Sequence, residues 1–206
     1  MKKIFIINGG QHFGHSGGQF NHTVSRETAA FFQDQPGYEV KMTDVSSDYD
    51  PDEEVRKYLW ADVIIYHFPV WWFSLPHGLK KYIDVVFSAG HDKGLYKSDG
   101  RSSKNPDINY GTGGTLKGRH YMFTSSWNAP KAAFTLPGEF FQERSVDDGV
   151  LFGFHRMNAF LGLSPLKTFH FHDVEKNADI PRDMALYRQH LQEVFAPKEV
   201  LTSVAV

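Results

Sequence analysis

Apolar residues occur along the chain in short runs, which alternate with longer stretches whose apolar positions recur every three to four residues. The short runs predict five strands, at 3–8, 38–45, 61–68, 121–125 and 167–172. The longer stretches predict helices at 23–33, 51–59, 76–89, 140–161 and 181–195, the fourth of them broken near Gly149 and Gly153. Strands alternating with helices indicate one α/β domain over residues 1–206.

The third predicted strand, 61–68, is almost continuously apolar, as a parallel strand covered on both faces requires. We therefore expect a doubly wound parallel sheet with helices on both faces, and five strands suit the flavodoxin-like order 2-1-3-4-5. Ligands of such sheets bind beyond the carboxyl ends of the strands. The segments that follow Ile7, Phe68 and Phe123 are therefore the candidate site.

The segment after the first strand, 8–21, is rich in glycine, amide, hydroxyl and imidazole groups and leads into a helix. Glycines allow close approach to the backbone, and a helix start presents unpaired N–H groups, so we expect a phosphate or pyrophosphate cradle near residues 14–23. The loop lacks the Gly-Lys-Ser/Thr of a P-loop and the Gly-x-Gly-x-x-Gly of a dinucleotide fingerprint. Of its histidines, His15 is better placed than His12 to donate to a phosphate. An ordinary polar loop is the alternative.

Aromatic residues follow the other two strand ends. The turn 69–73, Pro-Val-Trp-Trp-Phe, either lies against a flat cofactor or packs under a neighbouring loop or in a dimer interface. The segment 123–130 again combines hydroxyls with an aromatic residue and a proline. Its hydroxyls could bond ring carbonyls while Trp127 packs on the ring, or it could be a polar turn with one core tryptophan.

Composition narrows the classes of function. The 206 residues carry a net charge of −2, which favours neither nucleic acid nor an acidic membrane, and the absence of cysteine excludes disulfides and thiol chemistry. No run is long and apolar enough to span a bilayer, and we expect a cytoplasmic protein. Aromatic residues reach 15%, enough to wall a site for flat ligands as well as to fill a core.

Several other features receive a weaker interpretation. The hydrophilic stretch 90–118 is too long for a simple connection, and we expect it to cover the site. His170 and His172 share a strand face, but no third ligand is identifiable, so no metal site is predicted. We expect His67 to be packed in the core. The acids 52–54 are interpreted as charges at a helix start, and the tail 198–206 has no interpretation.

The segments 13–21, 69–73, 76–87 and 127–130 together resemble the NAD(P)H:quinone oxidoreductase family, and the resemblance covers essentially residues 1–195. It implies a flavodoxin-like fold, bound FAD, NADPH or NADH as hydride donor and a homodimer with the flavin near the subunit interface. It also implies two-electron reduction of quinones by a ping-pong mechanism, in which the flavin carries the chemistry.

The candidate flavin-binding residues combine the patterns with the resemblance. The cradle contributes His15, Ser16, Gly17, Gly18, Gln19, Phe20, Asn21 and Thr23; the aromatic turn contributes Pro69, Val70, Trp71, Trp72 and Phe73; the fourth strand end contributes Thr124, Ser125, Ser126 and Trp127. The resemblance adds Tyr110, whose contact with FAD could cross the dimer. Mammalian members place a tyrosine and a histidine where this chain has residues 125–128 without that pattern, so no protein acid or base is assigned.

Two alternative functions stay open. One is an FMN-dependent azo- or nitroreductase or an iron reductase, which released flavin would distinguish. The other is a flavodoxin-type electron carrier without turnover of its own, although carriers tend to be strongly acidic and a charge of −2 fits that poorly. Neither alternative involves nucleic acid or a membrane span.

Overall fold

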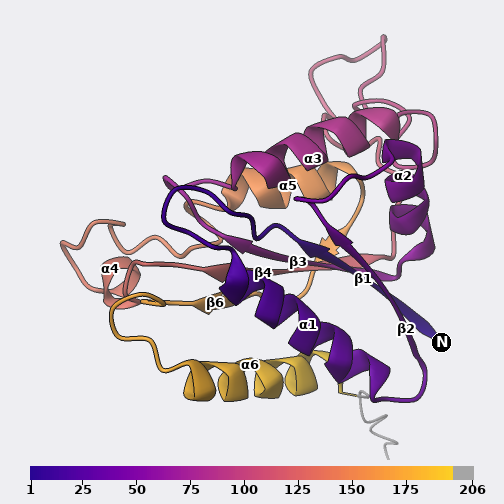
Figure 1. Ribbon diagram of the computed structural model, residues 1–206. Coiled ribbons are helices and arrows are strands. Elements are labelled where there is room, and N and C mark those ends of the chain that lie inside the picture. Colours follow the sequence, from indigo (N-terminus) through magenta and orange to yellow (C-terminus); the bar gives the residue numbers. More distant parts are fainter. Residues whose placement is uncertain (197–206) are drawn as a thin grey trace, which may run out of the picture.

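The computed structural model describes residues 1–196, so the tail 198–206 lies outside the described part of the chain. Its six-stranded sheet has the order β2-β1-β3-β4-β5, and β6 pairs with β4 beyond β5 (Figure 1). All strand pairs are parallel. The predicted fold class and strand order are therefore confirmed. The strands are β1 (Lys2–Asn8), β2 (Tyr38–Asp44), β3 (Val63–Pro69), β4 (His120–Ser126), β5 (Ser164–Pro165) and β6 (Phe169–Phe171).

Helices cover both faces of the sheet. α1 and α6 lie on one face, and α2, α3 and α5 lie on the other (Figure 1). Within residues 1–196, none of these helices is both long and apolar enough to traverse a bilayer. Their bounds are α1 (Gln19–Gln33), α2 (Pro51–Trp60), α3 (His77–Ala89), α4 (Ala132–Thr135), α5 (Phe152–Phe160) and α6 (Ile180–Phe195).

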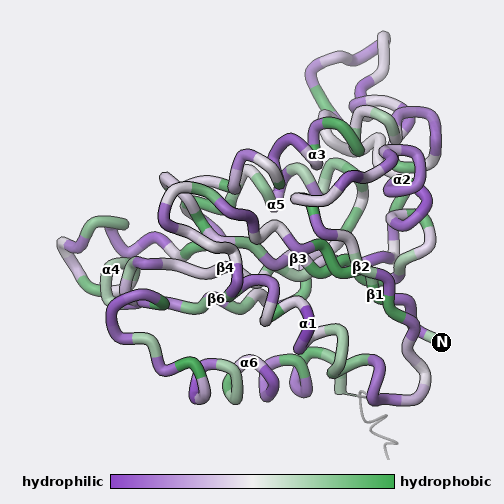
Figure 2. Tube along the Cα trace, viewed as in Figure 1, coloured by the Kyte–Doolittle hydropathy of each residue, from purple (hydrophilic) through white to green (hydrophobic). Residues whose placement is uncertain are grey.

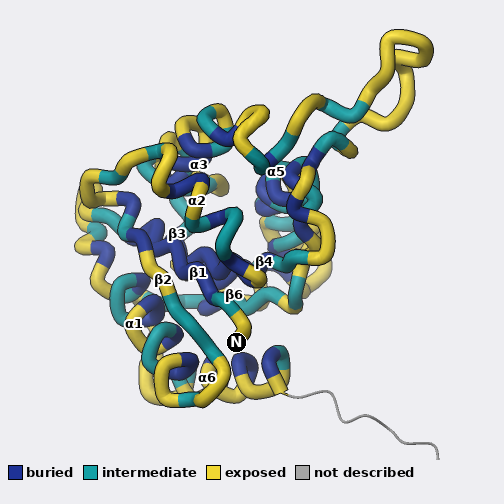
Figure 3. The backbone as a smooth tube through the Cα atoms, turned by 90° about the vertical axis from the view of Figure 1, so that its right-hand side faces the viewer, coloured by how far each residue is buried: buried dark blue, intermediate teal, exposed yellow. Residues whose placement is uncertain are grey.

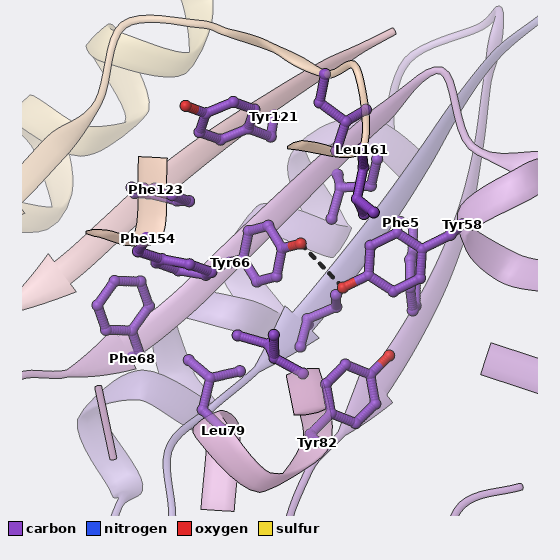
Figure 4. Packing of buried hydrophobic residues seen from close by; sticks show 14 of the residues in the cluster. Phe5, Tyr58, Tyr66, Phe68, Leu79, Tyr82, Tyr121, Phe123, Phe154 and Leu161 are labelled. Atoms are coloured by element: carbon purple, nitrogen blue, oxygen red, sulfur yellow. Dashed lines mark hydrogen bonds between the residues drawn. The ribbon is translucent and has the colours of Figure 1, made fainter. Parts of the chain in front are cut away.

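The central strands divide their side chains between two cores. In β1, Ile4 and Ile6 face α1 and α6, whereas Phe5 and Ile7 face α2 and α3, because successive side chains of a strand point to opposite faces. The central strands carry the most hydrophobic part of the trace (Figure 2). On the α3 side the core is largely aromatic, and the Tyr58 and Tyr66 hydroxyls hydrogen bond at 2.9 Å (Figure 4).

Glu54, interpreted from the sequence as a helix-start charge, belongs to this core instead. Asp50 caps α2 by accepting a hydrogen bond from the Glu53 N–H. The Glu54 side chain turns inward, where Thr43, Lys57 and Tyr82 donate to its carboxylate. Glu54 is only 1% exposed. Its charge therefore ties α2 to β2 and α3, since a buried carboxylate needs several donors.

Two predicted elements differ from the structure. The helix predicted at 140–161 is helical only over α5, because Gln142 and Glu143 have positive φ and the Ser145 side chain closes a separate turn with Asp148. The strand predicted at 167–172 is present as the shorter β6, and β5, which precedes it and also pairs with β4, was not predicted. Both departures occur at one edge of the sheet, where turn chemistry outweighs hydrophobic periodicity.

The middle of the loop 90–118 extends outward from the body of the molecule (Figures 1 and 3), whereas Leu95 and Leu116 near its ends are buried in the core. The loop follows the last residue of α3, and its end is anchored by the Leu116 N–H, which donates to the Leu161 carbonyl. α3 has 13 residues, so its two ends are about 20 Å apart. Because the first turn of α3 contacts the 8–21 loop, the loop 90–118 does not cover that loop within one chain, contrary to the expectation.

Candidate functional site

A cavity of about 550 Å³ lies where the carboxyl ends of β1, β3 and β4 meet. This is the edge predicted to bind a ligand, and the segments after Ile7 and Phe68 and the end of β4 all contribute to it. The predicted residues that line the cavity are His15, Ser16, Gly17, Gly18, Gln19, Phe20, Asn21, Pro69, Val70, Trp71, Trp72 and Ser126. Phe13, Gly14, Asn128, Val174 and Glu175 also line it and were not among the predicted site residues.

The first wall of the cavity is the start of α1. Gly18 precedes the helix with φ of 70°, no side chain caps the helix, and the first internal hydrogen bond runs from the His22 N–H to the Gly18 carbonyl. The N–H groups of residues 19–21 therefore have no partner within the helix. No Lys or Arg is among the described residues that line the cavity. An anion here would be bound by backbone N–H groups and the helix dipole.

Two glycines allow this loop to fold tightly. A Cβ on Gly10 would lie 2.8 Å from the Asn21 Cβ and 3.0 Å from the Asn8 Oδ1. A Cβ on Gly18 would lie 2.9 Å from the Gln11 nitrogen, in addition to the cost of its positive φ. The Gly10 N–H donates to the Asn8 Oδ1 at 3.0 Å, so β1 itself holds the loop in place.

Gln11 connects this loop to α3. Its Oε1 accepts a hydrogen bond from the Gly78 N–H at 3.0 Å, which caps a helix that has no side-chain cap of its own. The neighbouring Phe13 ring lies 5.0 Å from the Trp71 ring and 5.2 Å from the His77 ring, centroid to centroid. The polar loop and the aromatic turn are therefore packed against each other and form one site.

The aromatic turn after β3 has an unusual backbone. Trp71 and Ser74 exchange two hydrogen bonds, and the two residues between them, Trp72 and Phe73, have φ of 47° and 59°. This left-handed region costs an L-residue about 1–2 kcal/mol. Trp72 is nevertheless 89% exposed at the cavity. Phe73 points elsewhere, 5.3 Å from Phe140, and does not line the cavity.

The end of β4 contributes one predicted residue to the cavity. Ser126 accepts a hydrogen bond from the Asn21 side chain at 3.1 Å, and its carbonyl accepts one from the Val70 N–H at 3.0 Å. Ser126 thus joins the start of α1 and the end of β3 to the end of β4. Thr124 and Ser125 are buried, and Trp127 is only 3% exposed, with its ring against Phe134. These three side chains do not reach the cavity, and Trp127 is the core tryptophan of the alternative interpretation.

Two other predicted residues also lie outside the cavity. Thr23 is on the second turn of α1, past the open N–H groups. Tyr110 lies in the loop 90–118, is 71% exposed, and packs beside Phe160 and Arg101. Within one chain, Tyr110 is therefore remote from the predicted cradle.

The histidines differ in environment. His67 is fully buried, and burial lowers its pKa to about 3, so it is a neutral core residue as the sequence predicted. His170 bonds to Ser125 rather than pairing with His172, and the two rings are 6.5 Å apart. A hollow of about 610 Å³ next to them, between β6 and α6, contains none of the predicted site residues.

Of the residues that the predictions missed, Phe13 and Gly14 lie in the predicted loop itself, and Asn128 follows the fourth predicted strand. Val174 and Glu175 lie in the loop after β6. This loop reaches the cavity because the Val174 N–H donates to the Trp127 carbonyl. Ligands of parallel sheets bind beyond the carboxyl ends of the strands, and this principle would have predicted these two residues only if we had also applied it to the last predicted strand.

Comparison with known proteins gives a consistent result. A family model described as the flavodoxin-like fold matches residues 2–195. An uncharacterized protein of Schizosaccharomyces pombe is 49% identical over 94% of this chain and 97% of its own length. The NADPH:quinone oxidoreductase MdaB of Haemophilus influenzae is 45% identical over 93% of this chain and 98% of its own length.

Solved structures share the fold. A protein of Klebsiella pneumoniae, provisionally named a quinone reductase, superposes with a TM-score of 0.71 at 22% identity, covering 95% of this chain and 86% of its own. The general stress protein 14 of Treponema denticola, solved in complex with FMN, superposes with a TM-score of 0.63 at 20% identity, covering 94% of this chain and 98% of its own. At these identities the likeness concerns the fold.

Proposed function

The chain belongs to the flavodoxin-like family that includes the NADPH:quinone oxidoreductases, and from this premise we propose that it is an FAD-dependent NAD(P)H:quinone oxidoreductase. The reaction transfers a hydride from NAD(P)H, takes up one proton, and converts a quinone to a hydroquinone. We propose a ping-pong order, in which NAD(P)H and the quinone occupy the same slot in turn. The proposed enzyme works in the cytoplasm on small molecules.

The observation that carries the proposal is the composition of the cavity at the carboxyl ends of β1, β3 and β4. It combines an uncapped helix start without basic side chains and an exposed tryptophan on a strained turn. Backbone N–H groups suit a phosphate that is held and not transferred, since no lysine is among the described residues that line the cavity. A flat aromatic side chain exposed beside them suits a planar ring. The residues present therefore fit a flavin nucleotide.

The residues have separate tasks in this proposal. Residues 19–21 bind the phosphates through their open N–H groups, and the turn 69–72 with Ser126 walls the ring. When bound, the flavin supplies the acceptance and delivery of the hydride. Val174 and Glu175 extend the cavity wall beyond the strands that hold the phosphates and the ring. A carboxylate there suits hydroxyl or amino groups rather than another phosphate, which favours the adenosine half of FAD over FMN.

The same resemblance supports a homodimer as part of the proposal. Tyr110 is exposed on a loop that extends away from its own cavity, so it could contact a flavin only in a second copy of the chain. The expected result of Tyr110→Ala is weaker flavin retention in a protein whose own cavity is unchanged. Molar mass by light scattering of the variant and of the natural protein measures whether the dimer is involved.

The visible spectrum of the purified protein tests the proposed function. We expect a yellow protein whose absorbance is bleached by NADPH under nitrogen and restored by a menadione-like quinone. Chromatography of the flavin released by denaturation identifies FAD, and FMN in its place would favour the azo- or nitroreductase alternative. A flavin that NADPH cannot reduce would favour the electron carrier, and a colourless protein that binds no added flavin would refute the proposal.

Gly10→Ala tests the cradle itself. The added Cβ would meet Asn21 and Asn8, so the loop must shift by several tenths of an ångström and the start of α1 moves with it. We expect at least about tenfold weaker flavin binding, equivalent to about 1.4 kcal/mol. The matched control is Gly153→Ala in α5, where a Cβ meets nothing within 4 Å. Equal flavin affinity of the two variants in a fluorescence titration would contradict the cradle assignment.

A further inference from the structure

A network of polar side chains lies beside the cavity, on the α5 side of β4, and takes no part in the site described above. Its centre is Asp147, whose side chain is 33% exposed. The Thr168 hydroxyl donates to its Oδ2 at 2.6 Å. The His155 Nε2 lies 3.0 Å from its Oδ1, and the His170 Nε2 lies 3.3 Å from the same oxygen.

Two arms extend from Asp147 to opposite ends of β4. In one arm, the His155 Nδ1 lies 2.7 Å from the Tyr121 hydroxyl, near the start of the strand. In the other, the His170 Nδ1 lies 2.7 Å from the Ser125 hydroxyl at the end of the strand. The Ser125 oxygen is also 2.8 Å from the Trp127 Nε1. One carboxylate therefore reaches both ends of the same strand.

The chemistry of the groups sets the direction of the hydrogen bonds in the second arm. An indole N–H only donates, so the Ser125 oxygen accepts from Trp127. Ser125 is fully buried, and its own hydrogen is satisfied only if it points to the His170 Nδ1. The His170 hydrogen then resides on Nε2, the atom that faces Asp147. The hydrogens of Trp127 and Ser125 therefore point along the arm toward Asp147, whereas the last step, from His170 to Asp147, is an electrostatic contact at 3.3 Å and not an aligned hydrogen bond.

The ionised state of Asp147 agrees with this arrangement. Burial alone would raise the pKa of Asp147, but hydrogen bonds from His155 and Thr168 and the adjacent His170 imidazole outweigh burial and hold the pKa well below its ordinary value. The arm ends where the cavity begins. Ser126 lines the cavity, and the Trp127 carbonyl accepts from the Val174 N–H of the opposite cavity wall.

We propose that Asp147 is a positioning residue for the flavin site: through His170, Ser125 and Trp127 it orients the end of β4 and the β6–α6 loop that wall the cavity. This inference rests on the proposed function. It also explains why Ser125 and Trp127, predicted from the sequence to face the ring, are buried beside it. The Ser125 and Trp127 side chains fix the position of this part of the cavity wall. Ser126, which lies between them in the sequence, faces the cavity.

The experiment compares Asp147→Asn and Ser125→Ala, which interrupt the arm to the cavity, with Tyr121→Phe, which interrupts the other arm. Each change removes or reverses a partly buried hydrogen bond, so we expect all three to lower the free energy of unfolding. Flavin affinity separates them. We expect the dissociation constant of the apoprotein for flavin to rise about fivefold to tenfold in the first two. We expect it to stay within about twofold of the natural protein in Tyr121→Phe.

A double-mutant cycle measures the coupling between Asp147 and Ser125 in flavin affinity, which a general loss of stability would not produce. Because Asp147 acts through Ser125, the double variant of these two residues binds flavin no more weakly than the weaker single variant. Asp147→Asn and Tyr121→Phe together bind like Asp147→Asn alone. Additive losses for the Asp147 and Ser125 pair, or a loss in Tyr121→Phe equal to that in Ser125→Ala, would overturn the proposal.

The Trp127 indole N–H resonance reports the arm in the protein without flavin. We expect Asp147→Asn to shift this resonance, assigned with Trp127→Phe, and Tyr121→Phe to leave it in place. An indole resonance that ignores Asp147→Asn overturns the positioning role even if the natural protein binds flavin. A natural protein that binds no flavin refutes the proposed function, and the resonance still decides the role of Asp147 in orienting the end of β4.

Discussion

Two tryptophans at neighbouring strand ends have opposite environments. Trp72 follows β3 and is 89% exposed at the cavity, whereas Trp127 follows β4 and is 3% exposed. Both stand near a proline and small hydroxyl residues, so their local sequences suggested the same role. The difference shows that a strand-end motif identifies the edge of the sheet where a site lies, but not which side chains enter it.

The backbone accounts for the difference. After β3 the chain reverses within four residues, and the left-handed conformation at Trp72 directs its ring outward. After β4 the chain continues beside β6, because the Trp127 N–H donates to the Phe171 carbonyl. Trp127 therefore turns into the core, where the Ser125 hydroxyl satisfies its indole N–H. The strained backbone therefore occurs at the exposed tryptophan, Trp72, and not at the buried one.

We expect the largest effect when Trp127→Ala is compared with Trp72→Ala. Removal of a buried indole costs about 3–5 kcal/mol of unfolding free energy, whereas removal of an exposed one costs less than about 1 kcal/mol. We expect the reverse order for flavin binding per folded molecule, with the greater loss in Trp72→Ala. Urea unfolding and flavin titration measure the two quantities, and equal stabilities of the two variants would contradict the comparison.

A second test concerns His67, which is buried in β3 two residues before the exposed turn begins. Burial lowers its pKa to about 3 from an ordinary value of 6.5, so between these values the unfolded chain binds a proton that the native protein does not. Stability therefore falls as the pH drops below 6.5. From pH 7 to pH 5 the loss from this residue is about 2 kcal/mol.

His67→Leu removes this titration. We expect its unfolding free energy to depend less on pH than that of the natural protein, with the difference confined to pH values below 6.5. Urea unfolding at pH 7 and pH 5 measures the effect. Identical pH dependence in both proteins would mean that His67 is not held neutral, and that burial in β3 does not extend as close to the turn as the structure places it.

The smallest expected effect separates the cost in stability of the strained backbone at Trp72 from the contribution of the exposed ring to flavin binding. Trp72→Asn and Trp72→Ala both remove the indole, but asparagine tolerates the left-handed region better than alanine. We expect Trp72→Asn to be more stable than Trp72→Ala by about 0.5–1 kcal/mol, with flavin binding equally weak in both. Thermal unfolding of the two variants measures the difference, and an alanine variant as stable as the asparagine variant would show that the turn relaxes.

Hydrophobic periodicity predicted most of the fold, and interactions that it does not describe account for the errors. The buried strand β3 and the amphipathic helix α3 have patterns that only one structure satisfies, so their bounds agree with the structure within one or two residues. The segment 140–151 has apolar residues at helical spacing but forms turns, because Ser145 and Asp148 bond within the segment. Glu54 looked like a surface charge because its donors come from β2 and α3, far away in the sequence.

The sequence by itself determined the class of fold and the edge of the sheet where the cavity lies, because these depend on local hydrophobic periodicity and on the glycines that allow tight turns. Only the tertiary structure decided which aromatic side chains reach that cavity, where the loop 90–118 lies, and that Asp147 connects with Ser125. These outcomes depend on backbone direction at single residues and on partners distant in the chain. Neither property is encoded in the spacing of apolar and polar positions.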